Sequence, residues 1–196
     1  MIPLQIRTFE TAQSSQTSQM MDSYSNRTSS IFTTFTTVLF TFATLNHLTY
    51  YFHPTSPTAT VRVSREHNLV FSEFKNYNAE QVKFDLDISV DLRTEYSWNV
   101  NQLYLFVVAS YETAKNTRNE VVVFDKILRE KKDYKFDLKQ QKVKYLLRDE
   151  FKNTLAGKKV TLAVKYQVMP VFGVMQMKEI QKASSELVVP KEYSKK

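Results

Sequence analysis

The stretch VKFDLDISVDL, residues 82–92, alternates apolar and polar side chains without interruption. Successive side chains of a β-strand point to opposite faces of the sheet, so this pattern predicts one strand with its apolar face on a core. The residues expected to be buried are Phe84, Leu86, Ile88 and Val90. The opposite face carries three carboxylates: Asp85, Asp87 and Asp91. We interpret this second face as solvated, because carboxylates at strand spacing share one outer surface.

The composition excludes several kinds of chemistry. The 196-residue chain contains two glycines, Gly157 and Gly173, which is too few for a glycine-rich phosphate loop or a dinucleotide fingerprint. It has no cysteine, which excludes thiolate metal sites, cysteine nucleophiles and disulfides. Nucleotide-dependent chemistry is not expected, and a metal enzyme would have to use carboxylates alone, for which Asp85, Asp87 and Asp91 are the candidates. We expect no cofactor and no small-molecule substrate.

The formal charge of +7 does not indicate a nucleic-acid partner. Residues 1–30 have no net charge, so the basic excess lies later in the chain. The basic runs at 129–133 and 139–142 include acidic or neutral residues, with no aromatic side chains between the basic ones. Such runs are typical of solvated faces of a folded domain.

An uncharged apolar segment follows a polar head. Residues 1–30 are rich in Ser, Thr and Gln, which predicts disorder. Ile31–Phe52 is long enough for a transmembrane helix, since about 20 helical residues cross a bilayer core. Its threonines can donate their hydroxyl protons to carbonyls one turn back. The alternative is a cleaved signal peptide, but this apolar run is longer and its N-terminal flank is neutral.

The charges beside this segment leave its orientation open. Arg27 lies before it, and Arg62 and Arg65 lie after it, so counting alone favours a cytosolic C-terminus by a small margin. The sequon at 26–28 lies close to the membrane and does not decide between the two orientations.

The rest of the chain predicts a mainly β domain. The expected strands are Ala59–Val63, Val82–Leu92, Gln102–Tyr111, Glu120–Leu128, Val160–Met169 and Ser185–Val189. They are rich in β-branched and aromatic residues and no long helical pattern separates them, which favours an antiparallel β-sandwich. The segment Lys142–Lys152 fits either a short helix or a further strand.

No set of residues predicts an active site. The three histidines, His47, His53 and His67, lie in or beside the apolar segment or in a polar loop, and no G-x-S-x-G motif is present. We interpret Trp98, the single tryptophan, as a core or edge-of-core aromatic. The sequence therefore gives no catalytic, cofactor-binding or metal residues, and it leaves the binding residues unassigned.

Several motifs nevertheless resemble a known family. The run Trp98–Leu105 and the run Asn119–Ile127 resemble the W-N-x-x-Q-L-F/Y-x-F/Y and N-x-V-V-x-W/F-D-K-I motifs of subunit 3 of the eukaryotic signal peptidase complex. Val143–Tyr145 resembles the family's T/V-K-Y segment, and 157–173 is similar to its G-x-x-V-T-L…V-x-P…G stretch. The likeness covers residues 21–193.

The resemblance implies a single-pass type II protein of the endoplasmic reticulum membrane. Its parts would be a disordered cytosolic head (1–30), a transmembrane helix (31–52) and a luminal β-sandwich (53–196). The family often has a glycosylation sequon before its V-T-L stretch; here 157–161 reads GKKVT, so glycosylation at that place is not expected. Residues 1–20 extend beyond the usual head, as a true extension or because translation starts at Met21.

The resemblance also implies a function. In that family the subunit is noncatalytic and supports removal of signal peptides by scaffolding the catalytic serine peptidase subunit. The implied partners are this subunit, the other subunits of the complex and the lipid bilayer. A receptor or adhesion protein with a ligand-binding β-sandwich ectodomain is the alternative, because fold alone does not decide function.

Overall fold

The structure is a computed structural model. It describes residues 24–64, 69–74, 79–149, 151–152 and 154–194. The chain divides into two compact units, Met1–Thr49 and Tyr50–Lys196.

The apolar segment forms α2 (Tyr24–Tyr50), an uninterrupted helix of 27 residues. Among the described helices, α2 is the one that is long and apolar enough to cross a membrane. Five of its threonines donate their hydroxyl protons to carbonyls four residues back, at 2.8–2.9 Å: Thr28, Thr36, Thr37, Thr41 and Thr44. Bonding inside the helix lowers the cost of placing these hydroxyls in lipid, as the sequence predicted.

The ends of α2 differ from the ends of the apolar segment from which the helix was predicted. α2 begins at Tyr24 instead of Ile31 and ends at Tyr50 instead of Phe52. Polar residues can continue a helix beyond an apolar stretch, so residues 24–30 are helical although the sequence assigned them to a disordered head. The remainder of that expected head, residues 1–23, lies outside the described residues.

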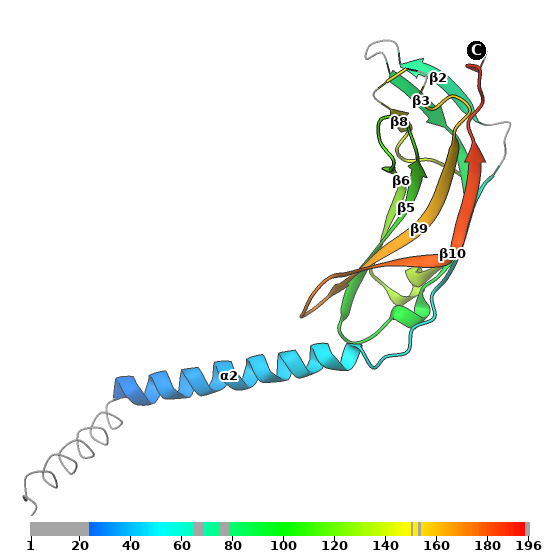
Figure 1. Ribbon diagram of the computed structural model, residues 1–196. Coiled ribbons are helices and arrows are strands. Elements are labelled where there is room, and N and C mark those ends of the chain that lie inside the picture. Colours follow the sequence, from blue (N-terminus) through cyan, green and yellow to red (C-terminus); the bar gives the residue numbers. More distant parts are fainter. Residues whose placement is uncertain (1–23, 65–68, 75–78, 150, 153, 195–196) are drawn as a thin grey trace, which may run out of the picture. The chain divides into compact units, whose positions relative to one another are not determined.

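The second unit consists of antiparallel sheets, which confirms the mainly β class (Figure 1). A four-stranded sheet has the order β10 (Gln176–Val188), β9 (Lys159–Pro170), β5 (Val100–Tyr111) and β6 (Asn119–Leu128). A second sheet has the order β1 (Thr58–Val63), β4 (Asp85–Asp91) and β7 (Lys135–Lys142). A third has the order β2 (Val70–Phe74), β3 (Ala79–Lys83) and β8 (Leu147–Asp149). Within the described part of this unit, the short 3-10 helices η2 (Arg93–Glu95) and η3 (Lys131–Tyr134) connect strands.

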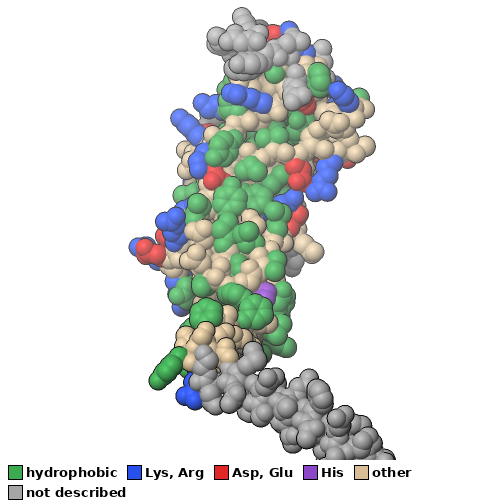
Figure 2. Space-filling view, turned by 90° about the vertical axis from the view of Figure 1, so that its left-hand side faces the viewer, with side chains coloured by type: hydrophobic (Ala, Val, Ile, Leu, Met, Phe, Trp, Pro, Cys, Tyr) green, Lys and Arg blue, Asp and Glu red, His purple; other side chains and the backbone are tan. Residues whose placement is uncertain are grey.

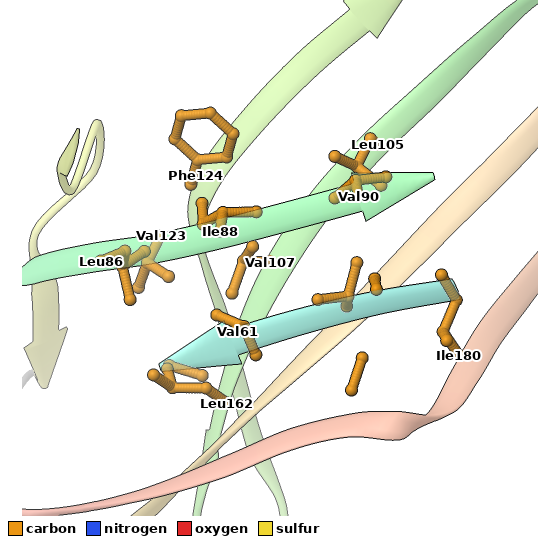
Figure 3. Packing of buried hydrophobic residues seen from close by; sticks show 14 of the residues in the cluster. Val61, Leu86, Ile88, Val90, Leu105, Val107, Val123, Phe124, Leu162 and Ile180 are labelled. Carbon is orange, nitrogen blue, oxygen red and sulfur yellow. The ribbon is translucent and has the colours of Figure 1, made fainter. Parts of the chain in front are cut away.

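The core lies between the four-stranded sheet and the sheet of β1 and β4. In Figure 3 side chains of β1 and β4, among them Val61 and Ile88, face those of the four-stranded sheet, among them Val107 and Leu162. Figure 1 shows β2, β3 and β8 at the end of the unit where the C-terminus lies. There the Ser194 amide donates to the Phe71 carbonyl at 2.8 Å.

The stretch 82–92 forms two strands in two sheets instead of the single strand expected. β3 pairs with β2 and β8, whereas β4 pairs with β1 and β7, and Phe84 lies between them. The Phe84 carbonyl accepts from the Val143 amide at 3.3 Å, so it remains bonded at this junction. The alternation continues through the junction, since Phe84, Leu86 and Ile88 have no exposed surface. Periodicity predicts which side chains are buried, but it does not reveal a change of pairing partners.

The other expected strands agree with the structure to different degrees. β1, β5, β6 and β9 confirm the expected segments within two residues at each end. β10 begins at Gln176 instead of Ser185, and its pairing with β9 shifts register between Glu179 and Ser184. In the open segment Lys142–Lys152, the described residues include the short strand β8 and no helix. The edge strands β2 and β7 were not expected; β2 is short, and β7 carries three lysines.

Trp98 is not a core residue, so that expectation was wrong. Its side chain is 65% exposed, whereas its neighbours Ser97 and Asn99 are buried. The backbone places the two polar side chains inward, and the aromatic side chain between them therefore points outward.

Candidate functional site

The three histidines considered for catalysis do not share one described unit. His47 lies on α2 in the first unit, His53 belongs to the second unit, and His67 lies outside the described residues. Within the described part of the chain, no group of three or more His, Cys, Asp or Glu side chains is placed to hold a metal ion.

The three carboxylates of the opening stretch occupy different environments. Asp85 is buried, so the expectation of a solvated side chain there was wrong; it lies at the junction where the chain passes between two sheets. Asp87 accepts from the Gln140 amide at 2.7 Å. Asp91 lies 2.6 Å from the Arg93 guanidinium, and the hydrogen bond from Arg93 lowers the pKa of its carboxyl. These contacts give structural roles to Asp87 and Asp91.

A buried polar cluster, which we call the Glu95 cluster, comprises Glu95, Tyr50, Tyr166 and Lys178. The Glu95 carboxylate has no exposed surface and accepts from the Tyr166 hydroxyl at 2.7 Å and the Tyr50 hydroxyl at 3.2 Å. The Lys178 ammonium donates to Glu95 at 3.1 Å and to the Tyr50 hydroxyl at 3.1 Å. The cluster connects η2 with β9 and β10.

The contacts of the cluster explain its protonation. Burial raises the pKa of Tyr166, and the hydrogen bond to Glu95 raises it further. Burial lowers the pKa of Lys178, but the bonds to Tyr50 and Glu95 outweigh burial, so the pKa is raised overall. The Glu95 cluster is a structural arrangement, because the carboxylate has no exposed surface to present to a substrate.

The motifs that carry the family resemblance meet in the fold. The Asp125 carboxylate of the F-D-K-I run lies 2.7 Å from the ammonium of Lys144, which belongs to the V-K-Y run. The two glycines of the third motif, Gly157 and Gly173, have φ values of 68° and 120°. Only glycine adopts such angles readily, which gives a backbone reason for its presence at both positions.

The outward side of the four-stranded sheet carries apolar residues, of which Ile127 is exposed, whereas Phe106, Val108 and Ala163 are buried within this chain. We define the outer sheet face by six residues whose side chains lie opposite to the core: Tyr104, Phe106, Val108, Val122, Ile127 and Ala163. The Tyr104 and Phe106 rings stack with centroids 5.2 Å apart. The charged residues at its margins form ion pairs, including Lys165 with Glu120 at 3.3 Å. Figure 2 shows one face of the molecule on which hydrophobic side chains gather along the middle and charged ones lie along the sides.

Sequence reasoning did not find the outer sheet face or the Glu95 cluster. The sequence does contain a signal for the face. From Leu103 to Ala109, β5 is a continuous apolar run without alternation. Such runs are typical of strands that are covered on both faces. No comparable pattern marks Glu95, because its partners come from distant parts of the chain.

Comparison with known proteins identifies the family. The family model described as signal peptidase subunit matches residues 21–192. The chain belongs to the signal peptidase subunit family. The resemblance noted from the sequence motifs is thereby confirmed.

Individual proteins are also similar to this chain. Signal peptidase complex subunit 3 of Homo sapiens is 30% identical over 135 residues, covering 66% of this chain and 73% of the relative. The Caenorhabditis elegans protein of the same name is 30% identical over 143 residues, covering 72% and 78% of the two chains. Adipocyte-related X-chromosome expressed sequence 1 of Mus musculus is 33% identical over 135 residues, with 66% and 73% coverage.

Membership in the signal peptidase subunit family supports a role in the signal peptidase complex and association with its other subunits. Together with α2, it fits a membrane-anchored protein of the endoplasmic reticulum. The relatives named signal peptidase complex subunit 3 indicate an accessory subunit.

Proposed function

We propose that this chain is a noncatalytic subunit that scaffolds the catalytic serine peptidase subunit of the signal peptidase complex. In this role it supports the removal of signal peptides from proteins entering the endoplasmic reticulum. The observation that carries the proposal is the family match over residues 21–192. The residues considered for catalysis support a noncatalytic role, since each carboxylate of the opening stretch is buried or bonded and the histidines are dispersed.

The proposed topology is single-pass type II, with the β unit in the lumen. Long folded domains translocate largely regardless of their charge, so the basic segment after residue 60 is compatible with a luminal location. Protease added to sealed microsomes should leave residues 61–196 intact until detergent is added. Digestion of this segment without detergent would overturn the topology.

The outer sheet face is the proposed contact with the catalytic subunit. Protein interfaces combine an apolar centre with a polar rim, and this face presents the exposed Ile127 beside the partly exposed Tyr104 and Val122, with ion pairs at its margin. Ile127 lies in the edge strand β6 directly opposite Tyr104, and its exposed side chain is accessible to a partner. A charge introduced there would have to be desolvated on assembly.

The test uses a matched pair of variants. Ile127→Lys changes an exposed β-branched residue on the outer sheet face, and Val70→Lys makes the same type of change on the edge strand β2 of another sheet. Purification of the full chain from native membranes should recover a membrane serine peptidase with wild type and Val70→Lys, and much less with Ile127→Lys. Equal recovery with both variants would reject this surface. Failure of the wild type to recover any peptidase would reject the scaffold role and favour the receptor or adhesion alternative.

A further inference from the structure

The connection between β9 and β10 presents apolar side chains to solvent. Together with the nearby segment before β5, it forms what we call the hairpin tip. Its exposed members are Tyr96, Trp98, Val171, Phe172, Val174, Met175 and Met177. Exposed aromatic and apolar side chains concentrated at one end of a unit indicate an interaction surface.

The backbone of the hairpin tip is held in place. The Asn99 side chain, which is buried, donates from Nδ2 to the Phe172 carbonyl at 3.0 Å and accepts from the Phe172 amide at 3.2 Å. The Val171 amide donates to the Asn99 carbonyl at 2.7 Å. These three bonds fix the tip to the start of β5, so the apolar side chains are displayed by an ordered backbone.

The hairpin tip is almost free of charge. Between Lys165 and Glu179 the one charged residue is Lys178, and its ammonium is bonded to Glu95 and Tyr50. The segment 96–111 contains no charged residue. The Lys131 ammonium lies 5.3 Å from the centroid of the Tyr96 ring, so Tyr96 marks the polar edge of the tip. Insertion of the β9–β10 connection into an apolar medium would not require the desolvation of unpaired charges.

The position of Tyr50 indicates what covers the hairpin tip. Tyr50 is the last residue of α2 and belongs to the second unit, where it contacts Glu95 and Lys178. Tyr96 follows Glu95 in the chain, and Met177 precedes Lys178. If α2 spans a bilayer, Tyr50 lies at the membrane interface. The hairpin-tip residues Tyr96 and Met177 are then each one residue along the chain from a side chain that contacts Tyr50.

We infer that the hairpin tip enters the interfacial layer of the bilayer that α2 spans, with Trp98 at the headgroup level and Val174 and Met175 at the acyl boundary. Tryptophan favours this layer because its ring is amphipathic, and apolar side chains of interfacial elements reach about 5–10 Å into it. The occupant is thus a lipid surface. This inference rests on the proposed membrane span of α2.

The chain allows a direct test, since Trp98 is its single tryptophan and it has no cysteine. The full chain is reconstituted in dioleoylphosphatidylcholine vesicles that contain lipids brominated near the headgroup end of the acyl chains. We expect about a two-fold loss of Trp98 fluorescence, because bromine quenches indole at short range and interfacial residues lie near that depth. Lipids brominated near the methyl end should quench less. Unchanged fluorescence with both lipids would overturn the inference.

Single-cysteine variants measure how deeply a labelled residue lies in the bilayer, and they include a matched control. Val174→Cys lies in the hairpin tip, and Val188→Cys replaces a similarly exposed valine in β10 away from the tip; the two valines are 69% and 60% exposed. With a nitroxide attached, the label at 174 should be accessible to oxygen and protected from a water-soluble nickel chelate. The label at 188 should show the opposite behaviour.

A third variant separates failure of this inference from failure of the proposed span. Leu39→Cys places a label in the middle of α2. A lipid-exposed label at 39 with a water-exposed label at 174 overturns the inference and leaves the span intact. A water-exposed label at 39 rejects the span and the inference together. In native membranes, a photoreactive side chain at 174 that crosslinks to protein and not to lipid also overturns the inference.

Discussion

The ammonium of Lys178 lies 3.1 Å from a carboxylate oxygen of Glu95, which has no exposed surface. Removal of one partner of a buried ion pair leaves an uncompensated charge, which costs about 3–5 kcal/mol. Lys178 is partly exposed and Glu95 keeps two tyrosine donors, so we expect Lys178→Met to lower the free energy of unfolding by about 3 kcal/mol, the lower end of that range. Urea unfolding of the full chain in detergent micelles measures this.

The control for this prediction is Lys139→Met, which removes an exposed lysine from β7. It should change stability by less than about 0.5 kcal/mol, as substitutions on an exposed surface usually do. Equal effects of the two lysine substitutions would contradict a structural role for the Glu95 cluster.

Tyr166 makes the stability of the β unit sensitive to alkali. Its pKa lies above the usual value of 10.0, because burial and the bond to Glu95 disfavour the phenolate. Above about pH 10 the unfolded chain loses this proton first, so the contribution of Tyr166 to stability, fully present at lower pH, falls as pH rises. The slope contributed by one proton approaches about 1.4 kcal/mol per pH unit.

Tyr166→Phe removes this titration, and the decline in unfolding free energy above about pH 10 should be shallower than in wild type. At neutral pH the variant should be less stable by about 1–3 kcal/mol, since Glu95 loses a donor. Urea titrations at several pH values measure both effects. If the unfolding free energy of Tyr166→Phe fell with pH as steeply as that of wild type, the deprotonation of Tyr166 would not be the cause of the decline.

Asp87 stabilises an irregular point in the pairing of β4 with β7. Its carboxylate accepts from the amide of Gln140, a residue with φ of 54°, next to a register shift between Leu86 and Ile88. Asp87→Ala should cost about 1–2 kcal/mol through loss of this hydrogen bond. Asp87→Asn keeps an acceptor oxygen and should stay within about 0.5 kcal/mol of wild type.

Substitution of the neighbouring residue Leu86 should destabilise the fold much more than Asp87→Asn. Leu86→Ala should cost about 2–5 kcal/mol, because it removes buried methyl groups from the core. Signal-peptide cleavage and subunit levels, followed together in cells, should fall together for Leu86→Ala and stay normal for Asp87→Asn. Loss of cleavage by Asp87→Asn in a fully assembled complex would contradict the noncatalytic role.

The helix α2, which we propose spans the membrane, has two chemically different sides. Thr33, Thr37, Thr41 and Thr44 lie on one side, and Phe35, Val38, Leu39 and Phe42 lie on the other. Small residues allow close helix packing in membranes, so we predict that the threonine side faces partner helices. Crosslinkers at Thr37 should give protein adducts in higher yield than crosslinkers at Phe42. Equal yields would mean that the helix has no preferred face.

The sequence predicted the buried side chains better than the pairing of the strands. Alternation marked Leu86 and Ile88 as core residues because side-chain direction is a local property of the strand. It did not reveal the change of sheet at Phe84, since pairing depends on segments far away in the chain, such as β1 and β8. For the same reason, the sequence predicted only the part of β10 that follows its register shift.

The functional surfaces were harder to predict. Trp98 was assigned to the core on its residue type, but two buried polar neighbours direct it outward. The Glu95 cluster joins residues at positions 50, 95, 166 and 178, and no local pattern connects them. The family resemblance was readable because its motifs are contiguous, and the structure adds that Asp125 and Lys144 of two such motifs meet.

The passage of one extended segment through two sheets at Phe84 also restricts how this family can change in length. An insertion or deletion in most strand connections is absorbed by a surface loop, but β3 and β4 have no loop between them. One added residue at Phe84 would turn every later side chain of β4 to the opposite face or displace β3 from its partners. Length changes in related chains should therefore accumulate in the connections on either side of this segment, and Val82–Leu92 should keep a constant length.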